Sequence, residues 1–533
     1  MFKKIVPLLL VVIMVVSVFG CSKPTATTAV QPTTAVQPTA VVQPTKAPEP
    51  TATAKPAETV MLDYYIMGTD PTDRTAVEAA INAYIEPLIN ADVTFHFIGW
   101  GDWSSKTITA LEAGEKMDIV FVADWYFYRK LVDEGLLTAM NDDKGPNGNL
   151  LKQYGQGITS GLNPAFLTGS AIDGVNYAIP TNKELSVPWG FLYNKTVADK
   201  IGFKDTDAAA VKSMADLEPW LAKAKAAYPD MYPYLTDGTI GFMQWVHAFA
   251  TNLSDYVINT NAIPDASGKV DESIFVPFET PWMADYLKTV RDWYTKGYIN
   301  PDAGLTTFDT GSVLNAGKFF IEPMPLKGNN IKAQEMMNAS GNADLKLGEI
   351  YGMPKVINTS DAGGSMLAIP AGSKYTVQAM KLLNLMHSDK KLLNMMVFGI
   401  ESTNWKLDPD GRVNVIDDTW LKAHPGPWVW ADITLQYVTN KQDPNTNQLL
   451  IDYAKDAFPE PSLGFRFQTT PVDAEITAIQ AVVDGSQRAL MTGYVDPATE
   501  LPKFIQALKD AGLDKVLAEV QKQYTAWKAT QSK

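Results

Sequence analysis

The alternation of apolar and polar positions predicts strands and helices in turn along the chain. Thr59–Ile66 has the composition of a strand, and Asp92–Ile98 alternates in the manner of a second strand. Between them, apolar residues close to helical spacing predict a helix over Arg74–Ile89. A strand, a helix and a further strand in this order predict an α/β fold with parallel strands.

The same alternation continues beyond these elements. Helical patterns cover Trp103–Ala113 and Tyr126–Glu134, and the second ends at Gly135, a residue suited to a helix C-terminus. Between them, the short apolar run Asp118–Val122 predicts a buried strand. Ligands in sheets of this kind bind beyond the carboxyl ends of the strands. The loop at residues 123–126 is therefore a candidate position for a site.

The N-terminus has the pattern of a bacterial secretory signal. A basic start precedes the apolar run Ile5–Phe19, and the only cysteine of the chain, Cys21, follows closely. The pattern predicts a signal peptide over residues 1–20. It resembles the lipobox of bacterial lipoproteins, which implies lipidation of Cys21, although Val18 and Phe19 depart from the preferred residues. The alternatives are a signal peptide followed by an unrelated cysteine and a membrane anchor, although the run is shorter than the roughly 20 residues that span a bilayer.

Residues 21–57 predict a lipidated cysteine followed by a disordered tether rich in Thr and Pro. This segment has no aromatic residue and a proline every few positions, so it cannot form a core. The chain as a whole has a net charge of -14, which argues against a nucleic-acid partner. Its 4 histidines show no paired spacing, so no metal site is expected.

Several segments resemble the extracellular solute-binding proteins of ABC importers, the maltose-binding-like family. In Leu111–Ala139 a small-residue helix end precedes Asp-Ile-Val-Phe, a loop with an acid and aromatics, and a helix closing on Gly-Leu-Leu. Further matches follow in the family's order: Asp173–Pro180 (DGVNYAIP), Trp189–Lys195 (WGFLYNK), Gly363–Pro370 (GGSMLAIP) with the helix Thr376–His387, Phe398–Trp405 (FGIESTNW) and Gly464–Lys528. The last resembles the C-terminal domain of a Gram-positive lipoprotein subgroup linked to oligosaccharide uptake.

The resemblance implies an α/β, two-lobed periplasmic-binding-protein-like (class II) fold with hinge crossovers and C-terminal helices. Lobe 1 would comprise residues 58–180 and return over 363–406. Lobe 2 would comprise 181–362, and 407–533 would hold its return and the C-terminal helical region. In this family the ligand lies in the cleft between the lobes. The crossings are expected near Thr181–Val187, near Asp361–Met366 and after Lys406.

A sugar site needs acids, amides or Arg for hydroxyl groups and aromatic faces for the rings. Asp124, Trp125 and Tyr126 fit this need, because they follow a predicted strand within a family-like segment. The alternative for Asp124 is a helix N-cap. Trp103, at the start of the preceding predicted helix, is a further candidate, with a core position as its alternative.

Other candidates combine an acid or a ring with a position on a loop or crossing. Glu184 and Trp189 lie on the first expected crossover, where a surface Glu and a core Trp are the alternatives. Trp245 is a possible stacking platform. Glu322 lies next to aromatic residues, and Trp405 ends a family segment that can equally serve structure.

Two more candidates precede a helix predicted over Val472–Val483. In the family a ring near Phe465 stacks on sugar, and Arg466 could pair with hydroxyl groups or an acidic sugar. The alternative for Arg466 is a salt bridge within the protein. Trp428 and Trp430 would share one side of a strand, as a binding face or, slightly favoured, as part of a core.

These observations predict a non-catalytic receptor that captures a carbohydrate, preferentially an oligosaccharide, and delivers it to the permease of an ABC transporter. We expect a monomer without a cofactor, lipid-anchored on the extracellular face of the cytoplasmic membrane of a Gram-positive cell. The sequence has no esterase, phosphate-loop or zinc-protease motif. Two alternatives stay open: a lipid-anchored polysaccharide hydrolase that uses two carboxylates, and a receptor for a peptide or another non-sugar solute.

Overall fold

The computed structural model of the chain describes residues 58–239, 242–243, 249–254, 258–261, 269–352 and 355–531. Cys21, the expected signal peptide and tether, and Trp245 lie outside these residues. No helix in the described part of the chain has the length and apolar character needed to cross a membrane.

A five-stranded sheet forms the centre of lobe 1, in the order β2-β1-β3-β12-β4. The strands β1 (Val60–Met67), β2 (Ala91–Ile98) and β3 (Ile119–Val122) run parallel, as their alternation with helices predicted. Between β3 and β4 (Ala178–Pro180) lies β12 (Met366–Ala368), antiparallel to both. A segment from far along the chain is thus inserted into the sheet.

Helices pack on this sheet because each buries one apolar face. The helix α1 (Arg74–Ile89) has the predicted bounds, and its buried residues Val77, Ile81, Ile85 and Ile89 recur every fourth position. The other elements of lobe 1 are α2 (Trp103–Glu112), α3 (Tyr128–Asp133), α4 (Leu150–Tyr154), α5 (Gln156–Gly161), α6 (Pro164–Ser170), α14 (Thr359–Ala362), α15 (Thr376–Met386), α16 (Lys390–Phe398), β13 (Trp405–Leu407), β14 (Val413–Val415) and α17 (Thr419–Ala423).

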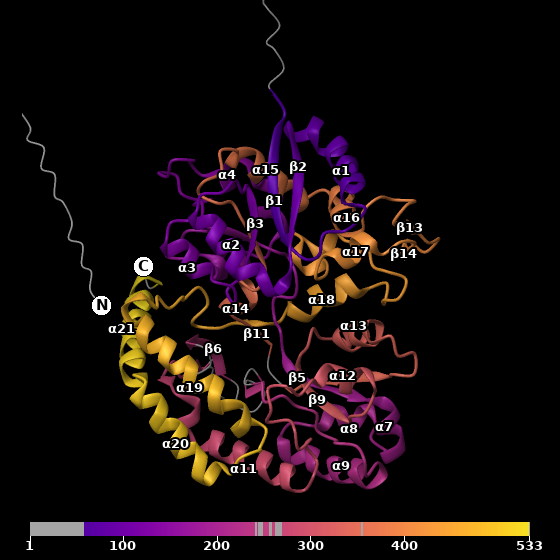
Figure 1. The fold of residues 1–533 in the computed structure, drawn as a ribbon, viewed down its shortest axis with the longest axis vertical. Coiled ribbons are helices and arrows are strands. Elements are labelled where there is room, and N and C mark those ends of the chain that lie inside the picture. Colours follow the sequence, from indigo (N-terminus) through magenta and orange to yellow (C-terminus); the bar gives the residue numbers. More distant parts are fainter. Residues whose placement is uncertain are drawn as a thin grey trace, which may run out of the picture. The chain divides into compact units, whose positions relative to one another are not determined.

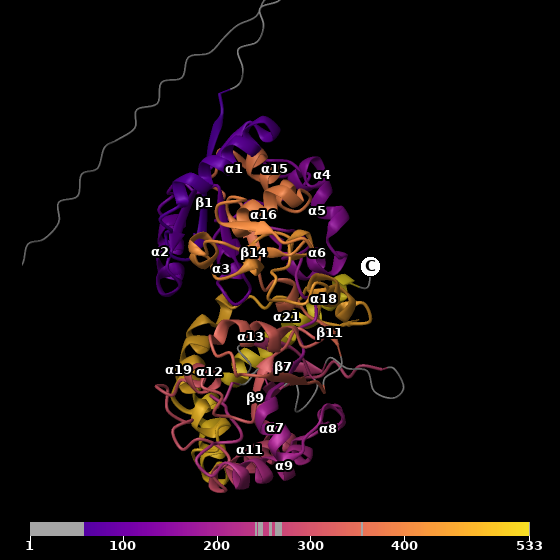
Figure 2. The same ribbon diagram turned by 90° about the vertical axis from the view of Figure 1, so that its right-hand side faces the viewer.

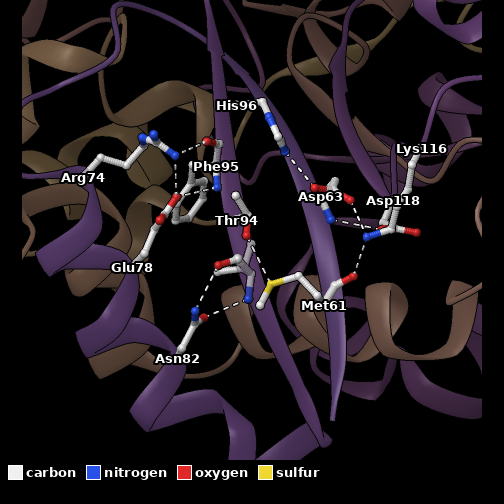
Figure 3. A network of polar contacts seen from close by, with 11 residues as sticks. Met61, Asp63, Arg74, Glu78, Asn82, Thr94, Phe95, His96, Lys116 and Asp118 are labelled. Carbon is white, nitrogen blue, oxygen red and sulfur yellow. Dashed lines mark hydrogen bonds and ion pairs between the residues drawn. The ribbon is translucent and has the colours of Figure 1, made fainter. Parts of the chain in front are cut away.

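Side-chain contacts tie the edge strand β2 to its neighbours (Figure 3). Across β1 and β2, His96 Nε2 lies 2.7 Å from Asp63 Oδ1, and the Asp63 N–H donates to Asp118 Oδ2 at 3.0 Å. On the other side of β2, the amide of Asn82 in α1 bonds both the carbonyl and the N–H of Val93, at 3.0 and 2.8 Å. The first contact links β2 to β1, the second links β1 to the residue before β3, and Asn82 links α1 to β2.

Lobe 2 is built on the antiparallel sheet β10-β5-β9. Its strands are β5 (Trp189–Asn194), β9 (Ile321–Pro325) and β10 (Leu347–Ile350). The remaining elements are α7 (Lys195–Ile201), α8 (Asp205–Ala210), α9 (Met214–Ala227), β6 (Phe249–Ser254), β7 (Ile258–Asn261), β8 (Ile274–Phe275), α11 (Pro281–Thr295), α12 (Thr310–Asn315) and α13 (Ile331–Ser340).

Three C-terminal helices extend the core of lobe 2. The helices α19 (Asp473–Met491), α20 (Pro497–Asp510) and α21 (Leu513–Gln531) follow one another along one side of this lobe (Figures 1 and 2). Met491 and Leu508 belong to the same apolar cluster as Trp293 of α11. These helices therefore pack as part of lobe 2.

The chain crosses between the lobes three times. The first crossing, residues 181–188, joins β4 to β5, and the second, residues 351–365, joins β10 to β12. The third lies later than the expected boundary after Lys406, because Val413, Trp420 and Trp430 are buried in the core of lobe 1. On the crossing segments, β11 (Val356–Ile357) pairs with β15 (Phe458–Pro459), and α18 (Thr446–Ala454) lies just before β15.

Candidate ligand-binding cleft

A cleft of about 2100 Å³ is lined by residues of both lobes and of the crossing segments. Trp100 and Trp125 line it from lobe 1, Lys327 and Lys332 line it from lobe 2, and Glu184 lines it from the first crossing. Cavities that hold drug-sized ligands measure roughly 300–1,000 Å³. This cleft therefore has room for an extended ligand.

Three tryptophans gather on the lobe 1 wall, and we call Trp100, Trp125 and Trp428 the tryptophan cluster. The rings of Trp100 and Trp125 are stacked, with centroids 5.8 Å apart and planes at 19°. Trp428 lies 6.3 Å from each of them, and Phe121 of β3 supports both Trp125 and Trp428. The cluster thus presents apolar ring surface to the cleft.

The loop after β3 fixes Trp125 in place. Its indole N–H donates to the carbonyl of Gly364 at 2.7 Å, while 48% of the residue is exposed. Tyr126 packs edge-on against this ring at 5.1 Å, and its hydroxyl accepts from the Ser104 N–H at the start of α2. A ring held by its polar edge and open on a face is suited to stacking with a ligand.

Asp124 forms a buried ion pair with Arg466 instead of capping the next helix. The N-cap of α3 is Phe127, with no side-chain cap, whereas the Arg466 guanidinium pairs with Asp124 and donates to the carbonyls of Gly169 and Ala171. Burial raises the pKa of Asp124, and the charge of Arg466 opposes this. The salt-bridge alternative for Arg466 is therefore what the structure contains.

A glycine makes room for this pair. A Cβ on Gly363 would lie 2.1 Å from Asp124 Oδ2 and 2.8 Å from the Arg466 guanidinium. The Asp124 N–H also donates to the Gly363 carbonyl at 2.9 Å. The second crossing thus approaches the loop after β3 so closely that no side chain fits between them.

Four charged residues form what we call the hinge charge cluster: Lys183, Glu184, Lys327 and Asp361. Glu184 Oε1 lies 3.4 Å from Lys183 Nζ and 3.9 Å from Lys327 Nζ. Burial acts to raise the pKa of Glu184, but the two lysines outweigh burial and lower it to about 2. Lys327 also pairs with Glu335 of α13 at 3.0 Å, so the cluster connects the first crossing with lobe 2.

Asp361 connects the first two crossings. Its Oδ2 accepts from the Val187 N–H at 3.1 Å and from the Asn358 amide at 3.0 Å. Burial raises the pKa of Asp361 to about 7, although Lys183 and these hydrogen bonds act in the opposite direction. The carboxyl group therefore titrates near neutral pH at the junction of two crossing segments.

The structure brings part of the sequence-predicted site together. The predicted residues that line the cleft are Asp124, Trp125, Glu184, Phe465 and Arg466. Phe465 is 5% exposed and packs edge-on against Tyr524 and Trp527 of α21, so it presents little ring surface.

Other predicted residues lie elsewhere. Trp103 and Trp405 are 1% and 4% exposed in the core of lobe 1, which is the alternative given for each of them. Trp189 packs against the core of lobe 2. Glu322 is buried on β9, and burial raises its pKa to about 8. Tyr126 supports Trp125 without lining the cleft.

Sequence reasoning missed Trp100 and slightly favoured a core position for Trp428, which lines the cleft. Trp100 stands three positions before Trp103 in the same segment, and it is the 51% exposed member of that pair. Trp428 lies in a 3-10 helix over Pro427–Val429 and not in a strand, so Trp428 faces the cleft while Trp430 is buried. The one available signal was their position in Trp-rich loops.

Within the described residues, no group of three or more His, Cys, Asp or Glu side chains is arranged to hold a metal ion. His424 lines the cleft but is buried, and burial lowers its pKa to about 4. The cleft is lined by rings, carboxylates, amides and both paired and unpaired cations.

The chain matches known families over most of its length. Residues 79–400 match the family described as bacterial extracellular solute-binding protein, and residues 461–529 match a domain of unknown function, DUF3502. A Streptococcus pneumoniae protein named carbohydrate ABC transporter substrate-binding protein is 29% identical over 477 residues. The match covers 87% of this chain and 90% of that protein.

Solved structures share the fold. The N-glycan transport solute binding protein NgtS from Streptococcus pneumoniae superposes with a TM-score of 0.73 at 25% identity, over 89% of this chain and 100% of that chain. NgtS has also been solved in complex with Man5GlcNAc, and that form gives a TM-score of 0.65 at 24% identity, over 88% and 99% of the two chains. The alginate-binding protein AlgQ2 is similar in fold alone, with a TM-score of 0.59 at 15% identity, over 88% and 98%.

Proposed function

Because this chain belongs to the bacterial extracellular solute-binding proteins, we propose that it is the receptor of an ABC importer and captures an oligosaccharide. The tryptophan cluster is the observation that carries this proposal. Trp100 and Trp125 leave about half of their surface exposed in a cleft that has room for several sugar units. Aromatic faces suit the C–H faces of sugar rings, and the acids and amides of the wall suit hydroxyl groups.

The relatives support a carbohydrate as the solute. One is named as a carbohydrate receptor of an ABC transporter, and NgtS has been crystallised with two N-glycan fragments. In our proposal, a ligand that contacts both walls stabilises a closed arrangement of the lobes, which the permease then recognises. The chain would bind its ligand without cleaving it and would act as a monomer.

A thermal-shift screen tests the nature of the solute. Ligand binding to the folded state at 100 times the dissociation constant adds about 2.7 kcal/mol of stability. We expect neutral oligosaccharides to raise the melting temperature and peptides to leave it unchanged. If peptides raise it and no carbohydrate does, the carbohydrate proposal fails. Release of shorter products from a labelled oligosaccharide would instead support a hydrolase.

We further propose that Cys21 carries a lipid anchor that holds the receptor at the extracellular face of the membrane. The basic start, the apolar run and the single cysteine support this proposal. Cells grown with a palmitate analogue should label the parent chain but not a Cys21→Ala variant. Equal labelling of both chains, or none of either, would contradict the anchor.

A further inference from the structure

We propose that this cleft selects uncharged oligosaccharides and rejects chains that place a carboxylate against its floor, by which we mean Asp124, Arg466 and the hinge charge cluster. The inference rests on the proposed function and adds the chemical class of the ligand. It follows from the ion pairs that the charged residues of the cleft already form with one another.

The buried cations of the cleft are already paired. The Arg466 side chain, 8% exposed, pairs with Asp124 and donates to two backbone carbonyls. Lys183, 9% exposed, pairs with Glu184. Lys327, 19% exposed, pairs with Glu184 and with Glu335. A ligand carboxylate at this floor would have to take a cation from a protein carboxylate, which would leave that acid buried and unpaired.

The buried acids, in contrast, keep unused acceptor oxygens. Asp124 Oδ2 and Glu184 Oε2 are both buried without a hydrogen-bond partner among the described residues. Both oxygens lack solvent-accessible surface, and Asp124 Oδ2 lies against Gly363, so they do not contact a ligand directly. Their negative charge would still repel a carboxylate placed against the floor. The floor therefore disfavours a ligand that carries negative charge.

The remaining cations of the wall are one paired arginine and two lysines that are in contact with solvent. Arg129 donates to both carboxylate oxygens of Asp133, at 2.9 Å each. Lys332 and Lys441 have no carboxylate within ion-pair distance in the described part of the chain, but both keep contact with solvent. Exposed cations of this kind are hydrated and screened by salt, so they add little affinity for an anion.

Calorimetry with matched ligands tests this selectivity. The full chain is titrated with Man5GlcNAc and other neutral oligosaccharides, and then with the C6-oxidised form of the strongest binder. Oxidation turns each free CH₂OH into a carboxylate and keeps chain length and linkages. We expect the oxidised ligand to bind at least about a hundredfold more weakly, in line with a repulsion of a few kcal/mol between charges at short range.

Two variants distinguish the effect of a charge in the cleft from the effect of the net charge of the protein. Glu184→Gln removes the carboxylate partner of Lys183 and one of the two partners of Lys327. It should therefore narrow the ratio of the dissociation constants of the oxidised and neutral ligands about tenfold. Glu475→Gln makes the same charge change on α19, where Glu475 pairs with Lys515, and should leave the ratio unchanged. If Glu184→Gln does not fold, Glu335→Gln, which removes the other carboxylate partner of Lys327, takes its place.

The outcomes distinguish the inference from the proposed function. If the oxidised ligand binds as tightly as the neutral one, the proposed charge selectivity is wrong. The proposal that the protein is a carbohydrate receptor would still hold. A ratio that both variants change equally would assign the effect to net charge and overturn the role of the floor. If neither sugar binds and a peptide does, the proposed function itself fails.

Discussion

Trp125 combines a fixed indole N–H with an exposed ring. Its hydrogen bond to Gly364 sets the orientation of the ring, and the stacked Trp100 extends the apolar surface along the cleft. The buried rings of Trp103 and Trp430 have no access to the cleft and serve the core of lobe 1. Substitution of Trp100 or Trp125 should therefore mainly change ligand affinity. Substitution of Trp103 or Trp430 should mainly change the free energy of unfolding.

Trp125→Ala should weaken oligosaccharide binding roughly tenfold, since an aromatic contact and its buried area contribute about 1–1.5 kcal/mol. The free energy of unfolding should change by no more than about 1 kcal/mol, because the ring is half exposed. Calorimetry and urea unfolding measure the two effects. Phe458→Ala removes a 39% exposed ring that does not line the cleft and should leave affinity unchanged. Equal affinities of the parent and Trp125→Ala would remove the stacking role.

Asp361 predicts a pH dependence of stability. Its folded pKa of about 7 lies above the ordinary value of an aspartate, so the folded state keeps a proton that the unfolded state releases. The stability of the parent should therefore fall with rising pH between about 4 and 7, by up to about 1.4 kcal/mol per pH unit, and level off above 7. Asp361→Asn has no carboxyl group to ionise, so its stability should not show this fall with rising pH. Urea unfolding of both chains from pH 4.5 to 8 should show the difference grow in favour of the variant; parallel curves would contradict the assigned pKa.

The residue types of the site could be read from the sequence more easily than their positions. Asp124 and Trp125 were found because a loop after a buried strand is where this class of sheet binds ligands. Trp100 and Trp103 lie three positions apart on either side of a helix start, and the local pattern does not reveal which ring is buried. Arg466 forms an ion pair with Asp124 and is not free for a ligand. The two residues lie far apart in the sequence, and only tertiary structure brings them together.

At the scale of elements, the Asp124–Arg466 pair joins the loop after β3 to the segment that leads into α19. Phe465 packs on α21 while the neighbouring Arg466 reaches into lobe 1, so two consecutive side chains contact different lobes. The pair is thus placed to hold the third crossing against the sheet of lobe 1.

Arg466→Met should destabilise the chain by about 3 kcal/mol, because it leaves Asp124 buried without its partner. Asp124→Asn combined with Arg466→Met should cost less than the sum of the single changes, with a coupling of about 2 kcal/mol in a double-mutant cycle. The exposed pair Glu475 and Lys515 is the control and should show a coupling below about 1 kcal/mol. Additive effects at Asp124 and Arg466 would show that the pair does not act as a unit.

Strongly periodic elements could be predicted and the third crossing could not. The helix α1 has the predicted bounds because its apolar residues recur at helical spacing. The return after residue 406 consists of the hairpin β13–β14, short helices and 3-10 turns. Such short elements carry no clear period, so the burial of Trp420 and Val413 in lobe 1 is decided by tertiary packing alone.

At the scale of the whole molecule, the C-terminal helices are part of the core of lobe 2. Arg488 of α19 donates to the carbonyls of Ala303 and Phe308, and Arg291 of α11 donates to the Gly493 carbonyl. Removal of residues 461–533 should therefore expose the apolar surface of lobe 2 and leave lobe 1 largely protected. Hydrogen exchange should show protection lost around α11 and kept in α1. Uniform protection in both lobes would contradict this dependence.

The central claim is that the cleft binds an uncharged oligosaccharide and releases it without cleaving it. Its most direct test is a calorimetric titration of the full chain with the strongest neutral oligosaccharide, followed by mass spectrometry of the recovered ligand. We predict a single site, weakened by Trp125→Ala, and a ligand of unchanged mass. Absence of heat with every carbohydrate, or recovery of shorter fragments, would contradict the account.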